Sequence, residues 1–187
     1  MTPPYITAWS GETGYTIRPE PFAERMPALF CHAGKQGDGR PVWGRISEER
    51  QRRCAALRLC QICGRAVAGV GYALVITSAT SIRDLVLTEP LVCRGCLPAT
   101  LSVATASLTA GHPRRLLAFE VSHYDLTAVL LRSKKPETEA DRAVNEALFE
   151  AGLDRVLGFL VLDNMRGRQL SMAELQQIDL HDEPEDE

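Results

Sequence analysis

Short alternations of hydrophobic and polar residues, rather than long apolar runs, dominate this chain. Two stretches rich in β-branched residues, 71–78 and 84–90, predict a pair of strands separated by a polar turn. The segments RLLAFEVS and LTAVLLRS predict a second hairpin, with residues 123–125 near its turn. The run RVLGFLVLD fits either a strand or a buried helix, because periodicity alone does not separate the two.

Other stretches have the spacing of helices. Ser47 and the two glutamates after it predict an N-cap and an acidic first turn for a helix through EERQRRCAALRL. Thr138 is expected to cap a helix over 139–152, and Ser171 with Glu174 has the spacing of a capping box. A further helix follows residue 96, because apolar residues recur at helical spacing at Leu97, Leu101, Ala104 and Leu108.

These patterns divide the chain into four parts. Proline and glycine interrupt every regular period in residues 1–46, where we expect an irregular N-terminal arm. Residues 47–112 form a compact module, and residues 113–180 form an α/β extension that packs on it. Residues 181–187 are expected to be a disordered acidic tail. The predicted fold class is α+β.

The amino-acid composition is ordinary, and its most informative feature is the number of cysteines. Hydrophobic residues make up 45% and charged residues 24% of the 187 residues, which is typical of a globular protein. The N-terminus lacks the features of a secretory signal, and no apolar run is long enough to span a membrane. Six cysteines without an export signal indicate a reducing compartment. We therefore expect a cytoplasmic protein with no membrane partner.

The strongest chemical signal is two C-x2-C motifs separated by twenty-nine residues. A two-residue spacer lets both thiolates of a pair approach one ion, and Gly64 leaves the backbone free to turn after the first pair. Zn²⁺ suits four thiolates because it is borderline soft, tetrahedral and free of redox chemistry. The predicted ligands of a structural Zn²⁺ are Cys60, Cys63, Cys93 and Cys96.

A cysteine knuckle, a hairpin and a helix that carries the last two ligands resemble the treble-clef zinc finger over residues 58–110. The resemblance implies a four-cysteine treble-clef zinc module, extended here by further strands and helices. Through GRPVWGRISEERQRRC…LCQICG and the later cysteine pair, the chain also resembles small uncharacterised zinc-finger proteins of high-GC bacteria and their phages. In those proteins a histidine follows the helix of the second pair, which implies His112 as its counterpart. Neither resemblance implies an activity.

Charge is distributed unevenly along the chain. Residues 40–65 hold seven arginines and two glutamates, whereas residues 137–187 hold fourteen acidic residues and four arginines. The helix after Ser47 is expected to expose its arginines while Cys54 and Leu57 point inward. Such a helix could contact successive phosphates, although a solvated helix face explains the same pattern. The candidate nucleic-acid-binding residues are Arg50, Arg52, Arg53 and Arg58.

These features favour a non-enzymatic zinc-binding protein whose structural site supports a surface for a protein partner or a nucleic acid. A thiol–disulfide redox protein is one alternative, although a thioredoxin-like site needs a single C-x2-C at a strand-to-helix junction. A divergent HNH-like nuclease that uses His112 is another. Against it, no histidine lies between Cys63 and Cys93, and four thiolates leave no open position for water.

The remaining cysteines are less informative. Cys31 and Cys54 are expected to be core thiols, although His32 beside Cys31 leaves an incomplete second metal site open. The stretch GKQGDGRP lacks the residue order of a phosphate-binding loop, and no GxSxG motif occurs. The oligomeric state cannot be predicted from these residues.

Overall fold

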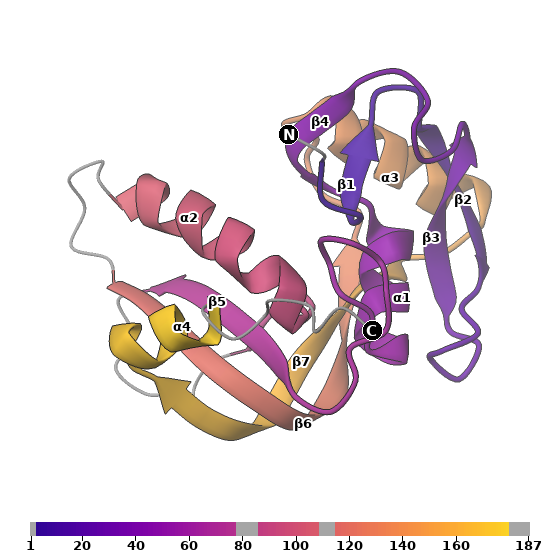
Figure 1. Ribbon diagram of the computed structural model, residues 1–187. Coiled ribbons are helices and arrows are strands. Elements are labelled where there is room, and N and C mark those ends of the chain that lie inside the picture. Colours follow the sequence, from indigo (N-terminus) through magenta and orange to yellow (C-terminus); the bar gives the residue numbers. More distant parts are fainter. Residues whose placement is uncertain (1–2, 78–85, 109–114, 180–187) are drawn as a thin grey trace, which may run out of the picture.

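The computed structural model describes residues 3–77, 86–108 and 115–179 and has a mixed α+β fold, as expected (Figure 1). The strands are β1 (Thr7–Trp9), β2 (Thr13–Pro19), β3 (Pro27–Ala33), β4 (Pro41–Ile46), β5 (Gly71–Thr77), β6 (Arg115–Arg132) and β7 (Arg155–Leu170). The helices are α1 (Glu48–Leu57), α2 (Leu97–Leu108), α3 (Glu139–Glu150) and α4 (Met172–Asp179), with a short 3-10 helix at Arg94–Cys96. No helix in the described ranges is long and apolar enough to cross a membrane.

In the described part of the chain, five strands form one sheet in the order β2-β3-β7-β6-β5, and β1 pairs with β4 separately. Neighbours in the large sheet are antiparallel, except that β3 and β7 run parallel and pair at Ala28 and Leu157. The long strands β6 and β7 pair along most of their length and run from one end of the fold to the other (Figure 1). They therefore join the N-terminal strands to the part of the chain that carries both cysteine pairs.

Helices cover both faces of this sheet. Side chains alternate between the two faces of a strand. Accordingly, Ala28 of β3 packs in a core with Ala55 of α1, whereas its neighbour Leu29 packs in another core with Leu148 of α3. Helices α1 and α3 therefore lie on opposite faces at this end of the sheet. At the other end, α2 and α4 share a core with Tyr72 of β5.

The N-terminal segment is not the irregular arm that its proline and glycine content suggested. Residues 3–46 contain four strands, two of which are antiparallel partners in the large sheet. Several of its glycines lie in a connection between strands: Gly34, Gly37 and Gly39, between β3 and β4, all have positive φ angles. Glycine adopts this conformation without the steric cost that other residues incur. Frequent glycine here marks tight turns between short strands, not the absence of strands.

The second expected hairpin is wrong, and the turn of the first lies outside the described residues. Strand β5 pairs with β6, and among the described residues 86–90 Leu87 makes an isolated bridge to Leu162 of β7. The segments RLLAFEVS and LTAVLLRS form the single strand β6. His123, expected near a turn, pairs with Arg166 of β7 at a register shift. The polar residues there mark an irregularity within a long strand, which bends a strand without ending it.

Most of the other local predictions agree with the structure or lie outside the described residues, although Ser47, at the N-cap position of α1, makes no capping hydrogen bond through its side chain. The run RVLGFLVLD belongs to strand β7. Thr138 caps α3 in a capping box with Asp141, and Ser171 forms a capping box with Glu174 at the start of α4. The predicted tail at 181–187 lies outside the described ranges.

Candidate metal centre

The first cysteine pair lies in a tight turn between α1 and β5. The backbone N–H of Cys60 donates to the carbonyl oxygen of Arg65, and that of Gly64 donates to the carbonyl of Cys60, both at 2.8 Å. Gly64 has a φ angle of 72°, and a Cβ atom at this position would lie 2.8 Å from the ring of Tyr5. Only glycine satisfies both the backbone conformation and the close approach of this ring.

Two other segments hold this turn in place through the backbone. Tyr5 donates to the carbonyl oxygen of Ile62 at 2.9 Å, so the N-terminal segment lies along the turn. Gln61 donates to the carbonyl oxygen of Leu91 at 3.0 Å, which brings in the segment before the second cysteine pair. These contacts use backbone atoms, which give no residue-type signal, so the sequence does not reveal them.

The second cysteine pair lies where an extended segment enters α2. Val92 and Tyr72 exchange backbone hydrogen bonds of 2.8 and 2.9 Å, which places Cys93 at the end of an anchored segment. Cys96 ends the 3-10 helix that continues directly into α2. The N-terminus of a helix carries a partial positive charge that favours a thiolate. The start of α2 therefore offers a favourable electrostatic position for the Cys96 sulfur as a metal ligand.

The fold brings the four predicted ligands together. The sulfur atoms of Cys60, Cys63, Cys93 and Cys96 all lie within 4.8 Å of one another. The Cys63 and Cys93 sulfurs are 3.8 Å apart, and the N–H of Cys93 donates to the sulfur of Cys60 at 3.3 Å. A tetrahedral ion with Zn–S bonds of about 2.3 Å holds its sulfurs about 3.8 Å apart. The donor set and its spacing therefore fit Zn²⁺.

The thiols differ in burial and in proton affinity. Cys60 is fully buried, and the other three cysteines of the cluster are partly buried. Burial raises the pKa of the Cys93 and Cys96 thiols. Burial acts in the same direction on Cys63, but hydrogen bonds from the backbone and side chain of Arg65 lower its pKa to about 6. The exposed Arg65 thus lies against the cluster, where its charge offsets part of the charge of the thiolates.

Arg52 does not belong to an exposed binding surface. Its side chain is completely buried, forms an ion pair with Glu20, and donates to the carbonyl oxygens of Gly158 at 2.8 Å and Leu29 at 2.5 Å. A guanidinium group in this position cannot reach a phosphate. The prediction that Arg52 binds nucleic acid is therefore wrong, because helical spacing shows which residues share a face but not which face is buried.

Two of the other three candidate nucleic-acid-binding arginines also make hydrogen bonds within the chain. Arg50 donates to both carboxylate oxygens of Glu12, at 2.5 and 2.9 Å. Arg58, at the left-handed C-cap of α1, donates to two backbone carbonyl oxygens. Arg53 is exposed, and its side chain makes no hydrogen bond or ion pair within the described residues. The surface expected from four arginines is thus reduced to one unengaged side chain.

The remaining candidate residues give mixed outcomes. Cys54 is buried as predicted, but Leu57 is 44% exposed rather than inward-facing. Cys31 is partly exposed and donates to the carbonyl oxygen of Ala33, and His32 is exposed. Within the described residues, neither joins a group able to hold a metal ion. His112 lies outside the described ranges.

Comparison with known proteins gives no relative. No family model, no curated protein and no solved structure matches this chain. The resemblance to treble-clef and phage zinc-finger proteins therefore has no support from a related protein. The functional interpretation rests on the geometry of the cysteine cluster and its surroundings.

Proposed function

We propose that this chain is a non-enzymatic zinc-binding protein in which Cys60, Cys63, Cys93 and Cys96 hold a structural Zn²⁺. The observation that carries this proposal is the convergence of four sulfur atoms within 4.8 Å. Four thiolates complete a tetrahedral shell, so the ion has no open position for a catalytic water molecule. Its role is then to tie the turn after α1 to the start of α2.

The proposed centre shares two features with a treble clef. A turn supplies the first two ligands, and the start of a helix supplies the last two. In addition, β5, the strand after the turn, pairs along its length with β6 of the large sheet and makes one bridge with Val92, just before the second cysteine pair. We therefore propose that the ion stabilises a junction within the whole fold and not a separate finger.

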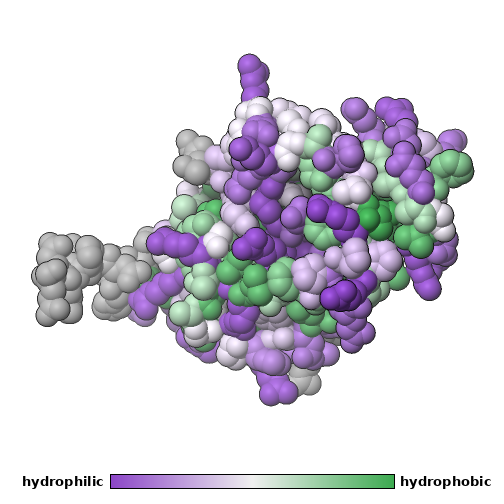
Figure 2. Space-filling view, turned by 90° about the vertical axis from the view of Figure 1, so that its right-hand side faces the viewer, coloured by the Kyte–Doolittle hydropathy of each residue, from purple (hydrophilic) through white to green (hydrophobic). Residues whose placement is uncertain are grey.

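The surface of this chain suits a protein partner better than a nucleic acid. Most of the candidate arginines are committed to contacts within the chain, and the whole chain has a net charge of −3. Trp43 and Phe149 are 59% and 87% exposed, and aromatic side chains are enriched in protein interfaces. On the face that carries β2, β3 and α3, hydrophobic side chains form several separate patches among hydrophilic ones (Figure 2).

Metal removal tests the structural role of the ion. We expect a zinc chelator at neutral pH to lower the free energy of unfolding by about 4 kcal/mol, the contribution of a ligand present at a thousand times its Kd. Urea unfolding followed by circular dichroism measures this change. Added Zn²⁺ should restore the original stability, whereas Mg²⁺, which prefers oxygen ligands, should not. Unchanged unfolding of demonstrably zinc-free protein would argue against a structural ion.

A further inference from the structure

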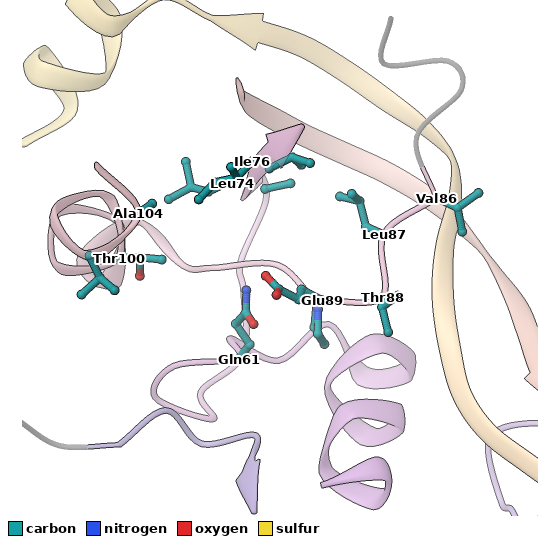
Figure 3. A pocket seen from close by; sticks show the side chains of 13 residues that line it. Gln61, Leu74, Ile76, Val86, Leu87, Thr88, Glu89, Thr100 and Ala104 are labelled. Atoms are coloured by element: carbon teal, nitrogen blue, oxygen red, sulfur yellow. The ribbon is translucent and has the colours of Figure 1, made fainter. Parts of the chain in front are cut away.

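A pocket of about 390 Å³ lies at the β5 edge of the large sheet (Figure 3). It is bounded by β5, by α2 and by residues 86–90. Its volume falls within the range of roughly 300–1,000 Å³ that is usual for small-molecule sites. Its walls are largely apolar and include Leu74, Ile76, Leu87, Val103 and Ala104.

Two polar side chains face into this pocket. Gln61 comes from the turn that holds the first cysteine pair, and Glu89 comes from the segment that leads to the second pair. Figure 3 shows the two side chains pointing toward one another. Neither side chain has a hydrogen-bond partner among the described residues, although Gln61 is only 8% exposed. The Gln61 amide faces the pocket and keeps some access to it, so its donors and its acceptor are available to a ligand there.

The charge in the pocket is also uncompensated. Glu89 as a whole residue is exposed, but burial of its carboxyl group raises the pKa of that group. No cation among the described residues forms an ion pair with it. A positive charge close to a carboxylate favours its ionised form. The missing partner of Glu89 therefore has the chemistry of a cation with hydrogen-bond donors.

We propose that this pocket binds a small primary amine with an apolar body, its ammonium group lying between Glu89 and Gln61. The carboxylate and the amide oxygen accept hydrogen bonds from the ammonium group, and the apolar walls cover the body. Binding depends on the zinc centre, because Gln61 lies between two proposed zinc ligands and α2 begins directly after Cys96. This dependence, unlike the pocket itself, rests on the proposed function.

Calorimetric titration of the full chain tests the proposal with a matched pair of probes, 4-phenylbutylamine and 4-phenylbutan-1-ol. The two share one apolar body and differ in the charged group. We expect the amine to bind with one-to-one stoichiometry and the alcohol at least tenfold more weakly. Glu89→Gln, which keeps the shape and removes the charge, should weaken amine binding at least tenfold. Glu137→Gln removes an exposed carboxylate that does not line the pocket and should leave binding unchanged.

Several results would overturn the proposal: no amine binding at millimolar concentration, equal binding of the alcohol, or equal amine binding by the Glu89→Gln protein. Zinc content is measured on the same samples, so that failure of the pocket and failure of the zinc centre are distinguished. A zinc-loaded chain that does not bind the amine would contradict the proposed amine site but not the zinc centre. Amine binding that is lost in Glu89→Gln supports the pocket, whether or not the chain carries zinc. We expect the original chain to bind the amine only when it is loaded with zinc, and binding by the zinc-free chain would contradict the dependence on zinc.

Discussion

Replacement of Cys60 by serine is expected to abolish stoichiometric zinc binding and, with it, about 4 kcal/mol of zinc-dependent stability. Cys60 is completely buried, and its sulfur lies within 4.8 Å of the other three. A serine hydroxyl stays protonated at neutral pH and cannot replace the thiolate, which is the form that binds metal. Zinc analysis after gel filtration and urea unfolding with and without added zinc measure both effects.

Two controls separate metal binding from packing. Cys31→Ser changes a partly exposed cysteine outside the cluster, so this variant should keep one zinc ion and the stability of the original chain. In the presence of a chelator, Cys60→Ser and the original chain should unfold at similar urea concentrations. A Cys60→Ser protein that retains a full equivalent of zinc would show that Cys60 is not a ligand.

Replacement of Arg52 by methionine is expected to lower the free energy of unfolding by about 3–5 kcal/mol, the usual cost of breaking a buried ion pair. The change leaves the carboxylate of Glu20, which is 2% exposed, without its counter-ion. It also removes the donors to the carbonyl oxygens of Gly158 and Leu29. Urea unfolding of the zinc-loaded variant, monitored by circular dichroism, measures the loss.

The adjacent arginine supplies the matched control for this variant. Arg53 is exposed and unengaged within the described residues, so Arg53→Ala should change stability by no more than about 0.5 kcal/mol. The double variant Glu20→Leu with Arg52→Met should be more stable than Arg52→Met alone, because no charge is then left buried. Equal stability of Arg52→Met and Arg53→Ala would contradict the burial of Arg52.

The features that could be predicted from the sequence depend on residues close together in the chain. The capping residues Thr138 and Ser171 act on groups three positions away, so a short window contains both partners. The spacing within each C-x2-C pair is equally local. Combining the two pairs into one site required only the general preference of zinc for four thiolates.

The features that could not be predicted depend on distant partners. Arg52 appears as one of several helix arginines, and its ion-pair partner Glu20 lies thirty-two residues earlier. Strand β5 has a plausible neighbour close in sequence, but its actual partner is β6. The pocket residues Gln61 and Glu89 come from separate segments; Gln61 is a spacer residue of the first C-x2-C motif, where any residue type is allowed, and Glu89 belongs to no motif. Each outcome was decided by tertiary packing, which local periodicity does not encode.

Native mass spectrometry of the full chain, purified under reducing conditions without added metal, tests the zinc centre most directly. We expect each chain to carry one zinc ion at neutral pH and to release it on acidification, when the thiolates become protonated. A metal-free chain whose mass shows the loss of hydrogen atoms to disulfide bonds would contradict the zinc centre and favour a thiol–disulfide function. A metal-free chain with all of its thiols reduced would contradict both.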